Sequence, residues 1–154
     1  MVPLLLALTG CGSSGGDGNS SKSSSYAQAK LCSEFADFLR SDLALDIDDS
    51  TEVHSDKPVG KGTSCPMNST STGLVGTLSM LRTGTASGDP SNDLGYVSQK
   101  GFDEKVWLAP DNRFRVQVGP WLGTMEFYHQ GDLSNDKTKQ SIQFLIRTTH
   151  EVNN

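Results

Sequence analysis

The stretch GFDEKVWLAPDNRFRVQVGPWLGTMEFY, residues 101–128, decides the fold that this sequence predicts. Apolar and polar side chains alternate at its centre, which is typical of a strand that buries one face. Phe114, Val116 and Val118 fall on one side, and Arg113, Arg115 and Gln117 fall on the other. We therefore expect the apolar side to pack in the core and the polar side to face outward.

Turn residues border this strand at both ends. Before it, Pro110 presets one central residue of a turn, and Asn112 tolerates unusual backbone angles. After it, Gly119 and Pro120 make a second tight reversal into a strand over residues 121–128. In that strand the apolar side chains in phase are Trp121, Met125 and Phe127. Together with the apolar run 106–108, these features predict an antiparallel β-meander.

Two amphipathic segments flank the meander. Residues 26–43 place apolar side chains at helical spacing, namely Leu31, Phe35, Phe38, Leu39 and Leu43. Near the C-terminus, Ser134 or Asn135 is placed to cap a helix with Ile142, Leu145, Ile146 and Val152 on one face. The β-branched content of this segment also fits a strand. The predicted fold class is α+β, with an N-terminal helix, an antiparallel meander sheet and a C-terminal helix in two layers.

The remaining segments give weaker signals. Residues 42–64 are polar, acidic and interrupted by Gly and Pro, so we expect a loop with at most one short strand. Residues 74–81 alternate weakly and predict a strand, and residues 84–92 are typical of a connector. Residues 92–100 fit either a short helix or an extended piece.

The quoted stretch resembles the actinobacterial lipoproteins of the DUF3558 type. Those proteins share a G-φ-D/G-x-x-A/V-W turn, a short hairpin and a strand with V-G-x-W, and a terminal helix follows. The resemblance covers roughly residues 31–151, and the cysteine of GTSC, Cys65, fits their upstream cysteine. This chain differs in its acidic insertion before Cys65 and in Lys105, where a small residue is usual. The resemblance implies an α+β domain and an envelope location, and it implies no particular activity.

A targeting signal lies at the N-terminus. Leu8-Thr9-Gly10-Cys11 follows a short apolar run and has the form of a lipobox, the cleavage and lipidation signal of bacterial lipoproteins. We interpret residues 1–10 as a signal peptide, truncated at its start because no basic residue precedes Lys22, and Cys11 as the lipidated residue. The alternative is an ordinary cysteine. Residues 11–25 are rich in Gly and Ser and predict a tether that reaches roughly 20 Å.

Lipidation of Cys11 leaves Cys32 and Cys65 as an even pair in an exported protein, which predicts a disulfide. Two free buried thiols are the alternative. No second apolar run approaches the ~20 residues that span a bilayer, so we expect a lipid anchor on the extracytoplasmic face of the cell membrane. The net charge of -5 argues against a nucleic-acid partner, because binding nucleic acid requires clustered Lys and Arg.

The sequence offers no catalytic, metal or cofactor motif. A G-x-S-x-G elbow is absent, and His54, His129 and His150 are not spaced as a metal pair on one helix. Two acidic runs fail the EF-hand pattern at its glycine position, namely Asp46, Asp48 and Asp49, and Asp89, Ser91 and Asp93. A solvated acidic loop is the favoured interpretation, and an irregular calcium site is the alternative.

The candidate binding surface is on the meander, with Arg113, Arg115, Trp121 and Tyr128 as its residues. Arginine pairs with phosphate and carboxylate groups, and an exposed ring beside it adds apolar area. The competing interpretation is that the rings, Trp107 and Phe127 included, only pack in the core and that the arginines pair with Glu126 across a hairpin.

The sequence thus predicts a tethered lipoprotein that acts as a non-enzymatic binding module of the cell envelope, without a cofactor. Its partners are the membrane, through Cys11, and an envelope protein, lipid or cell-wall polymer. One alternative is a prophage-type lipoprotein that excludes a second phage. Another is an envelope hydrolase or its regulator, which requires an apposed Ser-His or Asp-His pair.

Overall fold

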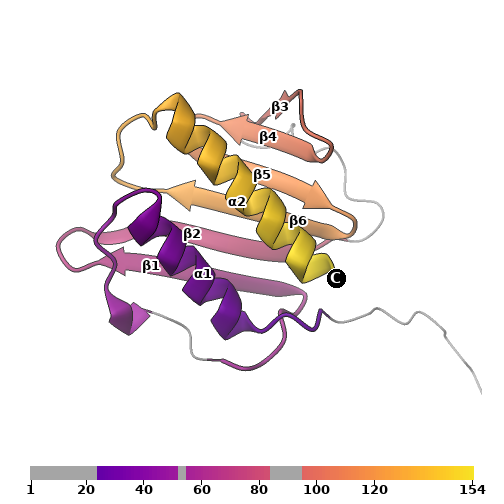
Figure 1. Ribbon diagram of the computed structural model, residues 1–154, viewed down its shortest axis with the longest axis horizontal. Helices are drawn as coiled ribbons and strands as arrows, with labels where there is room; N and C mark the ends of the chain where they lie inside the picture. Colours follow the sequence, from indigo (N-terminus) through magenta and orange to yellow (C-terminus); the bar gives the residue numbers. More distant parts are fainter. Residues whose placement is uncertain (1–23, 52–54, 84–94) are drawn as a thin grey trace, which may run out of the picture.

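The protein is described by a computed structural model in which residues 24–51, 55–83 and 95–154 are placed. Two α-helices lie on one side of a six-stranded antiparallel sheet, so the predicted two-layer α+β fold is confirmed (Figure 1). The elements in chain order are α1 (Gln28–Ser41), the 3₁₀ turn η1 (Asp49–Thr51), β1 (Gly62–Ser69), β2 (Gly73–Arg82), β3 (Val97–Gln99), β4 (Lys105–Ala109), β5 (Arg113–Val118), β6 (Trp121–Phe127) and α2 (Asn135–Asn153).

The strands are ordered β1-β2-β6-β5-β4-β3 in the sheet. Strands β4, β5 and β6 form the predicted meander, and β3 extends it beyond β4. The β1–β2 hairpin adds to the other side of the meander by pairing β2 with β6. The prediction for residues 42–64 allowed one short strand, and β1 begins there at Gly62 and continues to Ser69. Pro66 lies inside β1, and an edge strand tolerates a proline because one side of it makes no ladder hydrogen bonds.

The turn between β4 and β5 has two residues with left-handed backbone angles, Asp111 at φ 63° and Asn112 at φ 56°. Asp and Asn tolerate this region better than most residues, which confirms the prediction for Asn112. The Asn112 side chain also donates to the carbonyl of Gly131 at 3.0 Å and accepts from the amide of Leu133 at 3.3 Å. The hairpin is therefore tied to the loop that leads into α2.

Both terminal segments are helical, as their spacing predicts. The Ser134 hydroxyl accepts a hydrogen bond from the Lys137 amide at 3.3 Å, so Ser134 is the N-cap of α2. The helices pack on each other through Phe38 and Phe144, whose ring centroids are 4.4 Å apart. The predicted apolar face of α2 is buried at Ile142, Leu145 and Val152, while Ile146 is partly buried.

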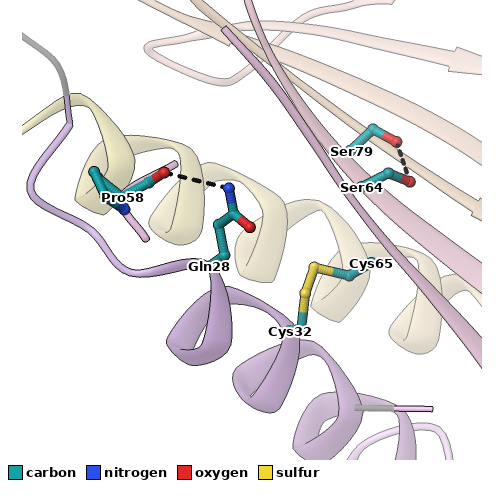
Figure 2. Close-up of a disulfide and its surroundings, with 6 residues drawn as sticks. All are labelled: Gln28, Cys32, Pro58, Ser64, Cys65 and Ser79. Carbon is teal, nitrogen blue, oxygen red and sulfur yellow. Dashed lines mark hydrogen bonds between the residues drawn. A yellow bond between two sulfur atoms is a disulfide. The ribbon is translucent and has the colours of Figure 1, made fainter. Parts of the chain in front are cut away.

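The predicted disulfide joins Cys32 on α1 to Cys65 on β1, with Cα atoms 5.2 Å apart (Figure 2). Both residues are fully buried. The bridge therefore fastens the N-terminal helix to an edge strand of the sheet, and the alternative of two free thiols was wrong.

Candidate functional site

The sheet has two different faces, one packed against the helices and one turned away from them, here called the outer face (Figure 1). Residues that pair across antiparallel strands point to the same face. The pairs Arg113↔Glu126, Arg115↔Thr124 and Gln117↔Leu122 therefore share the outer face. Phe114, Val116 and Val118 are buried toward the helices, as the alternation predicts.

Tyr96, just before β3, brings the two arginines together. The guanidinium carbon of Arg115 lies 4.1 Å from the centroid of the Tyr96 ring, and that of Arg113 lies 5.5 Å from it. Both distances are within the range of a cation–π interaction. Trp107 is paired with Arg115 in the sheet, and Tyr96 and Trp107 are each 3% exposed. These two rings are buried but do not belong to the main core.

Glu126 and Tyr128 complete the group. The Tyr128 hydroxyl donates to Oε2 of Glu126 at 2.6 Å. This hydrogen bond, together with burial, raises the pKa of Tyr128. We call Tyr96, Arg113, Arg115, Glu126 and Tyr128 the arginine–tyrosine cluster.

Two polar atoms of this cluster are buried and have no hydrogen-bond partner, the Tyr96 hydroxyl oxygen and Nε of Arg115. Burial raises the pKa of Tyr96, although the Arg115 charge acts in the opposite direction. The Tyr96 hydroxyl thus keeps its proton at neutral pH. Both atoms are therefore hydrogen-bond donors that lack an acceptor.

The structure brings together three of the four residues of the predicted binding surface and separates the fourth. Trp121 is 3% exposed and belongs to the helix-side core, so its assignment to this surface was wrong. The physical reason is its phase, since Trp121 shares a face with Met125 and Phe127. Sequence reasoning missed Tyr96, because the segment 92–100 gave no clear period and only the aromatic ring itself was a signal.

A second polar site contains a histidine. On α2, Nε2 of His150 lies 2.6 Å from Oε1 of Glu104, in a surface pocket of about 370 Å³ that Lys105 and Gln117 also line. No Ser, Thr or Cys lines this pocket, so the pair has no hydroxyl or thiol nucleophile beside it. His129 lies two residues after the end of β6, and His54 lies outside the described residues.

The contact between His150 and Glu104 leads to a prediction about the pKa of Glu104. The hydrogen bond from His150 lowers the pKa of Glu104. Because folding lowers this pKa, the pair stabilises the fold above the ordinary carboxyl pKa, and the contribution is lost as the pH falls through the lowered value. We expect His150→Ala to raise the Glu104 pKa in a carboxyl NMR titration and His129→Ala to leave it unchanged. An unchanged Glu104 pKa in His150→Ala would contradict the assigned cause.

The carboxylates of the acidic loop after α1 form hydrogen bonds and an ion pair with other residues of the domain. Asp46 accepts from Thr70, Asp48 accepts from the amide of Ser50, and Asp49 pairs with Arg40. Within the described residues, no group of three or more Asp, Glu, His or Cys side chains is arranged to hold a metal ion. The second acidic run, Asp89, Ser91 and Asp93, lies outside the described residues, as does Cys11.

Another acidic groove, of about 390 Å³, lies between the helices and is lined by Glu34, Asp37, Asp42 and Glu151 together with Arg147. The Tyr26 hydroxyl reaches both Glu34 and Glu151, at 2.5 and 3.0 Å. Burial and these hydrogen bonds raise the pKa of Tyr26. The contacts tie the chain before α1 to both helices.

Comparison with protein-family models, curated proteins and solved structures finds no match to this chain. In residues 24–51, 55–83 and 95–154, no helix is long and apolar enough to cross a membrane.

Proposed function

We propose that this protein is a lipid-anchored module on the extracytoplasmic face of the cell membrane that binds an envelope component through the outer face of its sheet. The observation that carries the binding role is the arginine–tyrosine cluster, which gathers two guanidinium groups around one ring. Arginine beside tyrosine is typical of binding surfaces, and Arg113 and Arg115 are both partly exposed.

The anchor is supported by the order of sequence features at the N-terminus. A lipobox ends at Cys11, and a Gly/Ser-rich segment separates it from Ser24, the first described residue. Two or more acyl chains hold a protein stably on a bilayer, whereas one chain gives only marginal binding. A tether of this composition lets the domain reach partners beyond the lipid headgroups.

A binding role fits the cluster better than catalysis. Its members are two permanent cations, two phenols with raised pKa values and one carboxylate that already accepts a hydrogen bond. Tyr128 beside Glu126 is the hydroxyl–carboxylate pair of the cluster, and the raised pKa of Tyr128 keeps that hydroxyl protonated, and so weakly nucleophilic, at neutral pH. Among the described residues, the Glu104–His150 pair favours a hydrolase, but no Ser, Thr or Cys lines its pocket.

The proposal predicts that Cys11→Ala moves the protein from the membrane fraction to the soluble or secreted fraction. The change removes the thiol that carries the lipid and leaves the folded domain intact. A clickable fatty acid should label the wild-type chain and not the variant. Equal labelling of both chains, or an unchanged distribution, would contradict the anchor.

In the same cells, a photo-crosslinking amino acid placed at single positions of the chain tests whether the outer face of the sheet binds a partner. Gln117 lies on the outer face and Gln143 is exposed on α2, so the two positions sample opposite sides of the domain. We expect a discrete adduct from position 117 that is absent from position 143. Equal adducts from both positions, or none from position 117, would contradict binding through the outer face.

A further inference from the structure

The arginine–tyrosine cluster carries more positive than negative charge. Glu126 is the carboxylate opposite Arg113, and it already accepts a hydrogen bond from Tyr128. Arg115 lies between Thr124 on β6 and Trp107 on β4, neither of which is charged. In the part of the chain that the structure describes, no Asp or Glu forms an ion pair with Arg115.

The cluster also holds Arg115 in place. Its guanidinium group stacks 4.1 Å from the centre of a ring that is itself 3% exposed. A free arginine loses much rotamer entropy when it binds a ligand, and a stacked one has lost part of it already. Arg115 is therefore a preorganised cation on the outer face.

Two donors in the cluster need an acceptor. The Tyr96 hydroxyl and Nε of Arg115 are both buried and without a partner, and such atoms are rare in folded proteins. Arg115 as a whole is only partly buried, so solvent reaches the rest of its side chain. An anion with several acceptor oxygens would satisfy donors that the protein leaves unmatched.

We infer that Arg115, together with Arg113 and the hydroxyl of Tyr96, binds a phosphate group. Phosphate offers several acceptor oxygens and keeps its negative charge as a diester, which matches two guanidinium groups and one phenol. The group belongs either to a lipid headgroup or to a soluble phosphate-containing polymer. The inference rests on the proposed function and names the chemistry of its ligand.

The test uses the full chain with Cys11→Ala, so that no lipid anchor contributes to binding. Glycerol phosphate is titrated while the Nε–H signals of the arginines are followed by NMR. We expect saturable shifts at Arg115 and Arg113, and an affinity at least about tenfold lower in Arg115→Gln, since a charged hydrogen bond accounts for a decade or more of binding. Lys139→Gln, on the exposed side of α2, removes the same charge elsewhere and should bind like the parent.

Two further variants separate positioning from folding. Tyr96→Phe keeps the ring and removes the hydroxyl, so we expect binding weakened several-fold and unchanged stacking shifts on the Arg115 signal. Arg115→Lys keeps the charge without the planar fork, and we expect it to bind more weakly than the parent. If Arg115→Gln shows no cooperative thermal unfolding, and so is not folded, Arg115→Lys replaces it in the binding measurements.

Sedimentation then distinguishes the sources of phosphate. Binding to phosphatidylglycerol vesicles that is lost in Arg115→Gln assigns a lipid headgroup, whereas Arg115-dependent binding only to soluble poly(glycerol phosphate) assigns a polymer. Binding to no phosphate probe, or equal binding by Arg115→Gln and Lys139→Gln, overturns the inference. The fractionation and crosslinking results are independent of either outcome, so a failed phosphate site leaves the proposed function to be judged on its own experiments.

Discussion

Removing the Cys32–Cys65 bridge is expected to lower the free energy of unfolding by about 3 to 4 kcal/mol. The two cysteines are 33 residues apart in the sequence, so the bridge removes much loop freedom from the unfolded chain. For a domain of this size, about 3 kcal/mol corresponds to a fall of roughly 10 °C in the melting temperature.

The segment between the two cysteines explains why this fold needs the bridge. Residues 42–61 contain only one short 3₁₀ turn in their described part. Backbone hydrogen bonds hold this segment at both ends, from the amide of Gln28 to Lys57 at 2.9 Å and from the amide of Asp48 to Asn68 at 2.8 Å. The disulfide is the covalent bond between α1 and the edge strand β1, and the fully buried Leu31, Phe35 and Leu39 of α1 add core packing.

The measurement is urea unfolding of the Cys32→Ala/Cys65→Ala variant beside the oxidised parent. Ser64 neighbours Cys65, and its exposed hydroxyl bonds that of Ser79 at 3.2 Å, so Ser64→Ala is the matched control (Figure 2). We expect the control to unfold within about 0.5 kcal/mol of the parent. An unchanged midpoint in the double variant, or two free thiols in the denatured, non-reduced parent, would contradict the prediction.

The sequence predicted the elements whose signals are local. Strand β5 alternates strictly, its turns contain Pro110, Asn112 and Gly119, and the N-cap serine precedes α2. Strand β1 carries no such signal, because Pro66 interrupts it and its polar residues do not alternate with apolar ones. Its pairing with β2 and the bridge at Cys65 supply what its own sequence lacks.

The candidate site was predictable only in part. Alternation along β5 correctly placed Arg113 and Arg115 on one face. The same alternation along β6 puts Trp121 in phase with Met125 and Phe127, so it already indicated that Trp121 belongs to the core. Tyr96 comes from a segment with no clear period, and it meets the arginines only because β3 pairs with β4 at the end of the meander. The alternation of apolar and polar residues along a strand cannot predict contacts that depend on the order of the strands in the sheet.

The second large effect is expected at Gly123, where β6 passes under α2. A Cβ atom built on this glycine would collide with the hydroxyl oxygen of Thr149 and lie 3.0 Å from Cδ1 of Leu145. Thr149 and Leu145 are fully buried, and the Thr149 hydroxyl donates to the carbonyl of Leu145 at 2.7 Å. Relief of this clash requires the buried Thr149 and Leu145 side chains to shift within the core, or the helix and the sheet to move apart.

Overpacking of this kind usually costs about 1 to 3 kcal/mol. We therefore expect Gly123→Ala to lie in that range and Gly123→Val to exceed it, as measured by urea unfolding. Gly131→Ala is the control, because nothing lies within 4 Å of a Cβ at that position. A Gly123→Ala variant as stable as the Gly131→Ala control would show that α2 does not approach β6 this closely.

A double-mutant cycle with Thr149→Ala identifies the atom responsible. The change removes the hydroxyl that the new Cβ would meet, while Leu145 stays in place. Residues in contact commonly show coupling energies of about 0.5 to 3 kcal/mol. We expect Gly123→Ala to cost less in the Thr149→Ala background than in the parent, by an amount within that range. An equal cost in both backgrounds would assign the clash to Leu145 and place the closest approach of helix and sheet one turn earlier along α2.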